Sequence, residues 1–473
     1  MALRDLLLFA TLLASIPVVL YRPWIGFLLW YWIALMSPHR LTWGFMYDFP
    51  VAVLVAAVTM MGLILARDRR PVPASPEIFL ICAMAAWFTL TTYLAWVPTA
   101  AWNYWEQFMK VLLFTLLTPM LIHGRRRVEW LMIVVAVSIG FYGIKGGVFT
   151  LATGGQSHVL GPPRSFIAGN TNLGLALVMT LPLILVLARQ ATQGRLACLP
   201  DSLWLRLAGW GGYGAFWLTG LATLFTFSRG AMVGLAAISP WVFLKLRRKL
   251  ALILVAVLAV GVIGVTVPDR LVQRVEALQG YQEDGSAMSR LQAWSVAWNI
   301  ARENPFTGAG FRLSGMGDER WLSYDTTTLE GWWPQRARAA HSNYFQVLGE
   351  HGFAGLGLYL ALLATVILCL FRLARQARKR PDTVWISEYA WALLVGVVGY
   401  VVAGAFLDMA YFTLFYAFVA LTLILRREYR TALEDRTAPA DAPAPAGRQS
   451  PQQPATTVPA WPGRAAGERS EAP

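Results

Sequence analysis

The residues best suited to chemistry are a few arginines and one histidine that border long apolar stretches. Arg229 stands in Phe-Thr-Phe-Ser-Arg-Gly-Ala as a lone charge at the junction of two apolar runs. A charge in this position is costly, which makes it a functional candidate. The alternative is an arginine that caps a hairpin between helices and reaches the interface with its long side chain. The following Gly230 permits a tight turn, and this context favours binding of a ligand.

A second arginine, Arg290, lies on an expected amphipathic helix that ends before Pro305. Its apolar residues recur at helical spacing, and they are Leu291, Trp294 and Trp298. Trp294 lies one helical turn from Arg290. We expect this helix to lie against the membrane surface, where the Arg290 guanidinium can form bidentate hydrogen bonds with a lipid diphosphate. Interfacial tryptophan anchors beside a solvated arginine would give the same spacing.

The next residues form a glycine-rich turn, Gly308-Ala-Gly-Phe-Arg312. Its backbone could pass close to a ligand, and Arg312 supplies a third cation. Arg164, in Gly-Pro-Pro-Arg-Ser-Phe, is a fourth candidate that could contact sugar or phosphate. The polar residues after it, Asn170 and Asn172, could equally cap a helix.

His341 begins the run His-Ser-Asn-Tyr-Phe-Gln-Val-Leu-Gly-Glu-His-Gly, where the next apolar stretch is entered. A helix N-terminus disfavours imidazolium, so we expect a neutral base. A lone histidine is more often structural, and only its place beside the arginine candidates favours catalysis. Asn343, Tyr344 and Trp294 are the remaining candidates for contact with substrate.

The elements that must position these residues are membrane helices. Of the 473 residues, 57% are apolar and 14% are charged, and the apolar ones form long blocks. About 20 apolar residues are needed to cross a bilayer. We expect 12 or 13 transmembrane helices, near 5–21, 24–36, 50–66, 77–97, 105–122, 128–152, 171–188, 209–227, 230–244, 250–267, 352–371, 388–406 and 409–425. Either of the first two could be re-entrant or interfacial.

Basic clusters predict the orientation of these helices. Under the positive-inside rule, six clusters should be cytoplasmic, and they lie near 67–70, 125–127, 189–206, 245–249, 372–380 and 426–430. The alternation leaves 37–49, 98–104, 153–170, the Ser228-Arg229 turn, 268–351 and 407–408 outside. The net charge of +14 therefore reflects basic residues at the ends of the membrane helices, which set their orientation. We expect no nucleic-acid partner.

Several kinds of chemistry lack a motif in this sequence. It has no phosphate-binding P-loop, no GxSxG nucleophile elbow and no HExxH, and its cysteines Cys82, Cys198 and Cys369 suggest neither a disulfide framework nor a metal site. The acidic residues of the large outer loop show no spacing typical of a metal cage. We expect neither metal nor cofactor, so arginine side chains must bind any phosphate group of the substrate.

The domain organisation follows from these patterns. We expect an all-α polytopic membrane protein with 12 or 13 transmembrane helices and one large periplasmic loop. Its expected parts are an N-terminal transmembrane region (1–160), a central transmembrane region (161–267), the large loop with the catalytic motifs (268–351), C-terminal transmembrane helices (352–430) and a disordered cytoplasmic tail (431–473).

Taken together, the motifs resemble those of the O-antigen ligase and polymerase family. The resemblance rests on Phe-Ser-Arg229-Gly, on Arg290-x-x-x-Trp with the following Asn-Pro-Phe-x-Gly-x-Gly-Phe, and on the run from His341. The front half, through Gly161-Pro-Pro-Arg-Ser-Phe-Ile, resembles the branch described as O-glycosylation ligases associated with exosortase A. Both likenesses together cover about residues 1 to 430.

The resemblance implies a fold similar to GT-C glycosyltransferases and a metal-independent, inverting glycosyl transfer at the outer face of the bacterial inner membrane. The donor would be an undecaprenyl-diphosphate-linked glycan, and the acceptor a hydroxyl of a protein or lipid. Arg229 and Arg290 would bind the diphosphate and stabilise its developing charge. His341 would act as general base on the acceptor hydroxyl.

Two other functions fit the same residues. A polymerase of the family would extend a lipid-linked repeat instead of passing it on. A lipid or polysaccharide transporter would use the large loop as a gate, but transporters usually carry charges in mid-membrane within two related halves. The sequence shows no such repeat, and Lys110 and Lys145 are the notable charges within spans.

Overall fold

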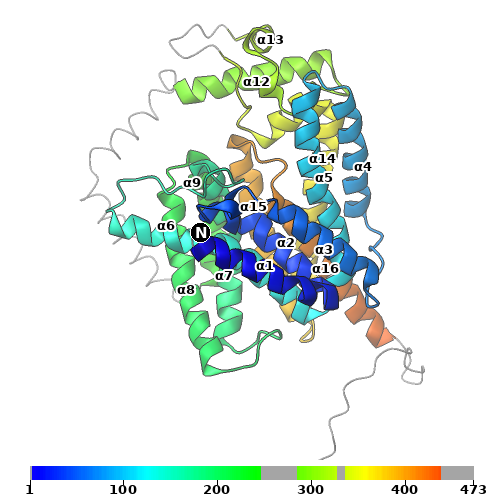
Figure 1. Ribbon diagram of the computed structural model, residues 1–473, viewed down its shortest axis with the longest axis vertical. Coiled ribbons are helices and arrows are strands. Elements are labelled where there is room, and N and C mark those ends of the chain that lie inside the picture. The colour runs from blue at the N-terminus through cyan, green and yellow to red at the C-terminus, as the bar shows by residue number, and fades with distance from the viewer. Residues whose placement is uncertain (1–2, 247–284, 328–335, 438–473) are drawn as a thin grey trace, which may run out of the picture. The chain divides into compact units, whose positions relative to one another are not determined.

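The computed structural model describes residues 3–246, 285–327 and 336–437, and within these ranges it is helical without a strand (Figure 1). This confirms the predicted all-α class. The chain divides into the units Met1–Ala432 and Leu433–Pro473, and helix α16 crosses the division. It continues to Thr437, so the first residues of the predicted tail are helical.

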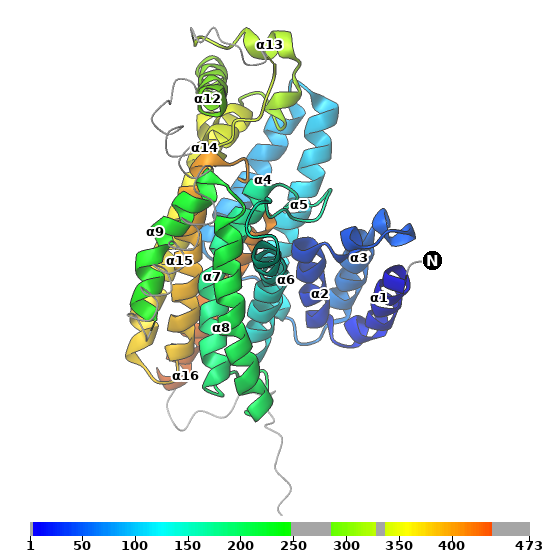
Figure 2. The same ribbon diagram turned by 90° about the vertical axis from the view of Figure 1, so that its left-hand side faces the viewer.

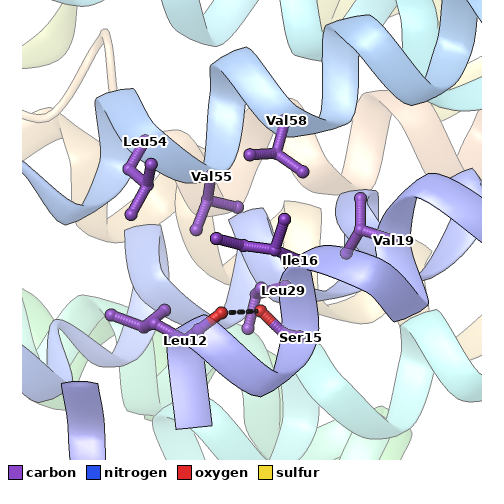
Figure 3. A pocket seen from close by; sticks show the side chains of 8 residues that line it. All are labelled: Leu12, Ser15, Ile16, Val19, Leu29, Leu54, Val55 and Val58. Carbon is purple, nitrogen blue, oxygen red and sulfur yellow. Dashed lines mark hydrogen bonds between the residues drawn. The ribbon is translucent and has the colours of Figure 1, made fainter. Parts of the chain in front are cut away.

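The first three helices pack together. They are α1 (Leu3–Tyr21), α2 (Pro23–Met36) and α3 (Val51–Leu65). They line an apolar pocket (Figure 3), whose residues are Leu12, Ser15, Ile16, Val19, Leu29, Leu54, Val55 and Val58. The Ser15 hydroxyl donates to the Leu12 carbonyl at 2.6 Å. This pocket has no charged side chain in its lining and therefore offers no acid, base or phosphate-binding group.

The remaining long helices run beside one another (Figure 2). They are α4 (Pro76–Tyr93), α5 (Pro98–Leu121), α6 (Arg125–Ala152), α7 (Asn170–Thr192), α8 (Leu203–Leu224), α9 (Arg229–Lys245), α14 (Asn343–Gln376), α15 (Val384–Ala403) and α16 (Thr413–Thr437). Helices α12 (Gly285–Glu303) and α13 (Asp318–Leu322) lie beyond the ends of α4, α5 and α14 (Figure 1).

By length and composition, six described helices could cross a membrane, namely α1, α4, α6, α7 and the helices over 343–379 and 384–406. A helix occupies every predicted span in the described part of the chain, and the span expected at 250–267 lies outside it. The predicted start of the fifth helix at residue 105 is wrong, because α5 already begins at Pro98. Proline suits the first position of a helix, where its missing N–H is not needed.

The loops predicted to be cytoplasmic contact one another at one end of the helices, here called the basic end. The Arg127 guanidinium donates to Asp68 at 2.7 Å, and the Gly124 amide donates to Glu428 at 3.0 Å. The Cys198 amide reaches Glu129 at 3.0 Å. The predicted alternation of loops is thus reflected in their spatial grouping.

Helix α14 bends at Gly352, and the glycine-rich turn docks on the bend. The amides of Ala309 and Gly310 donate to the carbonyls of Gly349 and Glu350 at 2.9 and 2.8 Å. These carbonyls would otherwise accept bonds from the next helical turn. The glycines of this turn therefore allow close approach to the protein's own helix, whereas the sequence suggested approach to a ligand.

We expect Gly352→Ala to lower the free energy of unfolding by about 1–3 kcal/mol or more. Gly352 has φ 68° and ψ −172°, a conformation essentially reserved for glycine. A Cβ atom there would lie 2.5 Å from the carbonyl oxygens of Pro305 and Phe306. Thermal unfolding in detergent measures the effect.

The matched control is Gly357→Ala on the same helix, because an added Cβ there meets nothing within 4 Å. Alanine should stabilise that helix by about 0.5–1 kcal/mol. Equal melting temperatures for the two variants would show that Gly352 is not packed tightly against the Pro305 and Phe306 carbonyls.

Helix α12 has a small core of its own. Four buried residues of α12 belong to it, namely Ala293, Val296, Ala297 and Ile300. They pack with Ala309, Leu313 and Trp321. Trp298 is 46% exposed. The apolar face of α12 is therefore not the one expected from Leu291, Trp294 and Trp298, because the small residues allow the closest packing against α14 and α13.

Candidate active site

His341 precedes helix α14 and faces a carboxylate. The helix begins at Asn343 with Ser342 as N-cap, so His341 lies outside it, with a left-handed backbone (φ 49°). Its Nδ1 lies 3.3 Å from Oδ2 of Asp408, and the two side chains are 49% and 19% exposed. Donation from Nδ1 to the carboxylate leaves Nε2 as the basic nitrogen.

Opposing effects act on Asp408. Burial raises the pKa of this carboxyl above its usual range, while the His341 imidazole, the His341 and Ser342 amides and the Arg290 guanidinium lower it. The second carboxylate oxygen, Oδ1, is buried and has no hydrogen-bond partner among the described residues. The carboxylate thus has unused capacity to accept a hydrogen bond next to the histidine.

The connection between α15 and α16, residues 404–412, carries Asp408 and is fixed by the start of α14. The Met409 amide donates to Oδ1 of Asn343 at 2.6 Å, and the Ala410 amide to Oε1 of Gln346 at 3.4 Å. The Tyr344 hydroxyl donates to the Val401 carbonyl at 2.7 Å. Asn343 and Tyr344 therefore hold the Asp408 segment against the helix that follows His341.

Glu350 joins this connection to the glycine-rich turn. Its buried carboxylate accepts from the Arg312 amide at 2.8 Å and from the Tyr411 hydroxyl at 2.7 Å. One acid thereby fixes two loops that border the site. No described contact joins Glu350 to His341, in agreement with the histidine lying outside the helix.

Helix α12 brings Arg290 to the same place. Trp294, one turn further along, donates from its indole nitrogen to the Ala340 carbonyl at 2.8 Å and stacks on Phe345 with ring centroids 5.0 Å apart. This fixes α12 beside residue 341. Arg290 then lies within electrostatic reach of Asp408.

Arg229 stands exposed at the start of α9, beside the segment that leads to Asp408. Ser228 caps the helix by accepting from the Ala231 amide at 3.2 Å. A Cβ atom on Gly230 would lie 3.2 Å from Phe406 and 3.7 Å from Leu407. Glycine therefore lets the first turn of α9 approach the 404–412 connection closely.

The other two arginine candidates differ in position. Exposed Arg312 lies over the Tyr104 ring at 5.5 Å, and Tyr104 is within electrostatic reach of Glu350 and Asp408, so Arg312 borders the site. Arg164 instead pairs with Asp48 at 3.6 Å. His341 and Arg290 thus lie near Asp408, Arg312 and the start of α9 contact residues that border it, and Arg164 lies on another group of loops.

Asp408 and Glu350 are the site residues that sequence reasoning missed. The one available signal for Asp408 was an acid in a connection predicted to lie on the same side as His341. In the described ranges, no three His, Cys, Asp or Glu side chains form a group that could hold a metal ion. The side chains near Asp408 are the His341 imidazole, which faces its carboxylate, and the Arg290 guanidinium.

Two protein families match parts of the chain. Residues 214–360 match the O-antigen ligase family, and residues 3–192 match a family of unknown function (DUF5935). The first match spans Arg229, Arg290, Arg312 and His341, the second spans Arg164, and Asp408 falls outside both. No curated protein matches the chain, and neither match bears on an association with exosortase. The segment that supplies most of the site therefore matches the O-antigen ligase family, and this match supports a multi-pass membrane enzyme of the ligase or polymerase type.

Proposed function

We propose that the protein transfers a glycan from a polyprenyl-diphosphate carrier, such as undecaprenyl diphosphate, to an acceptor hydroxyl. The observation that carries this proposal is the His341–Asp408 pair with Arg290 beside it at one end of the helices. Because the basic end lies opposite, the site would face the periplasm of the bacterial inner membrane. The family match supports glycosyl transfer in general.

The proposed reaction is a single displacement. Nε2 of His341 takes the proton of the acceptor hydroxyl as its oxygen bonds to the anomeric carbon. The bond from that carbon to the diphosphate oxygen breaks, and its electron pair leaves with the diphosphate. Attack from the opposite face inverts the anomeric centre. Asp408 keeps the Nδ1 proton in place throughout.

Arginine would supply the other half of catalysis. Charge builds on the diphosphate as its bond breaks, and we assign its stabilisation to Arg290 and Arg229, with Arg312 at the border. A guanidinium matches two phosphate oxygens at once. In this scheme arginine alone provides the positive charge, and no metal ion takes part.

The acceptor separates a ligase from a polymerase. The test is in vitro transfer from an undecaprenyl-diphosphate glycan with candidate acceptors supplied one at a time: a protein, a lipid and the lipid-linked repeat itself. Product on protein or lipid supports the ligase, which we propose. Extension of the lipid-linked repeat alone would identify a polymerase, and no transfer to any acceptor would contradict both.

We expect Asp408→Asn to lower kcat by about 10²-fold with little change in the donor KM, because the imidazole loses the group that selects its tautomer. The carboxylate must be ionised, so activity should be present above its pKa and lost as the pH falls through it. Burial places that loss at a higher pH than for a solvated aspartate, about 3.9. Asp408→Glu should recover part of the rate.

The pH profiles of kcat for the wild type and Asp408→Asn provide the measurement. If kcat falls at the same acidic pH in both proteins, and Asp408→Asn has a normal rate, the aspartate takes no part in the mechanism.

A further inference from the structure

A second group of polar and aromatic side chains lies on the loops 37–50 and 161–169, apart from the His341 site. We propose that this surface, here called the Tyr47 platform (Arg40, Trp43, Tyr47, Asp48 and Arg164), binds the glycan part of the donor several sugar units away from the reacting bond. The inference rests on the proposed function and adds to it a dependence on glycan length.

The platform is built around the ring of Tyr47. The guanidinium carbons of Arg40 and Arg164 lie 4.8 and 5.7 Å from the ring centroid. Both arginines share Oδ1 of Asp48, at 3.1 and 3.6 Å. Asp48 and Arg164 are 74% and 69% exposed, and such surface ion pairs contribute only about 0–1 kcal/mol to stability. Stability does not account for this arrangement.

Both loops are held firmly. The Ser165 hydroxyl donates to the Pro162 carbonyl at 2.7 Å, and a Cβ on Gly161 would lie 1.9 Å from the Ile167 carbonyl oxygen. On the other loop, buried Asp5 accepts from the Gly44 amide at 3.1 Å. These contacts fix the backbone on which the platform stands.

Arg164 itself adopts a left-handed backbone, with φ 54°. This costs of order 1–3 kcal/mol in a residue whose side chain is mostly exposed. A rigid loop that holds an exposed arginine in this conformation is organised in advance for a ligand.

The chemistry of the platform fits carbohydrate. Sugar rings present C–H faces that pack on aromatic rings, and their hydroxyls pair with planar guanidinium and carboxylate groups. Trp43 adds an indole that is 78% exposed, with Arg4 over its ring at 4.5 Å. A membrane interface would also accept Trp43 and Tyr47. It would not require a shared carboxylate or a left-handed arginine.

The platform connects to the reaction site through a continuous set of contacts. The loop that carries Arg164 continues into α7, where Asn170 donates to the Thr226 carbonyl at 2.9 Å. Earlier in that loop, the His158 and Phe227 rings lie 5.1 Å apart. Phe227 stands two residues before Arg229. A glycan whose diphosphate lies at Arg229 could therefore extend along this loop to Tyr47.

The test compares donors of different length. Arg164→Asn, which tolerates the left-handed backbone, and Tyr47→Ala should raise the KM for an undecaprenyl-diphosphate polysaccharide at least about tenfold, with kcat unchanged. The KM for a donor with one sugar should change less than about twofold. Arg302→Ala, an exposed arginine at the far end of α12, is the control and should alter neither. Equal effects on both donors, or no effect on either, would overturn the platform.

A binding measurement separates this proposal from the proposed function. The probe is the oligosaccharide released from the cell's own lipid carrier by mild acid, titrated against purified protein. Wild type should bind it, and Tyr47→Ala should bind at least about fivefold more weakly. Absence of binding by wild type, or a Tyr47→Ala defect limited to retention in membranes, would overturn the platform whether or not transfer occurs. Wild-type binding without transfer would contradict only the proposed function.

Discussion

His341→Ala is expected to lower kcat for glycan transfer by about 10²–10⁴-fold while the KM for the lipid-linked donor stays nearly constant. Loss of a positioned general base has this magnitude. The imidazole is placed by the backbone before α14 and by Asp408 at 3.3 Å, and donor binding is assigned to arginine. Initial rates of transfer by purified protein, at saturating donor and acceptor, measure the effect.

The control for this variant is His158→Ala, which removes another exposed histidine on a loop at the same end of the helices. It should retain kcat, and both variants should insert into the membrane as the wild type does. If purified His341→Ala transfers glycan at a nearly normal rate, the imidazole is not the base.

Arg290→Ala should reduce kcat/KM by about 10²–10³-fold, the usual cost of removing one group that stabilises developing negative charge. Arg290→Lys should recover only part of this, because an ammonium provides charge without the bidentate fork. The kinetics of transfer from the diphosphate-linked donor, at several donor concentrations, give both constants.

Arg302→Ala is the matched control, since Arg302 lies on the same helix, α12, in its last turn. Its kinetic constants should equal those of the wild type. Equal losses for both variants would indicate a general effect on α12 or on surface charge, and would remove the specific role of Arg290.

Most of the fold could be predicted because long apolar runs and basic clusters are local features. Each predicted span in the described chain coincides with a helix, and the predicted cytoplasmic loops meet. The start of α5 was missed because its first turns carry polar residues, with Pro98 as the only local sign of a helix start. The bend at Gly352 could not be seen either, since it depends on a turn that docks from outside the helix.

The site was predictable in part for the same reason. Sidedness alone placed Arg229, Arg290, Arg312 and His341 at one end of the helices. The partner of His341 was not predictable, because the position of Asp408 depends on buried hydrogen bonds that the Met409 and Ala410 amides donate to side chains far away in sequence, those of Asn343 and Gln346. Arg164 also lies on the predicted side, but its contacts belong to Tyr47 and Asp48.

Equilibrium binding of undecaprenyl diphosphate to purified protein tests most directly whether Arg290 binds the lipid carrier while His341 performs the proton transfer. The wild type and His341→Ala should bind with dissociation constants within about twofold of each other. Arg290→Ala should bind at least about tenfold more weakly, a loss of about 1.4 kcal/mol. Undiminished binding by Arg290→Ala would contradict the proposed division of roles.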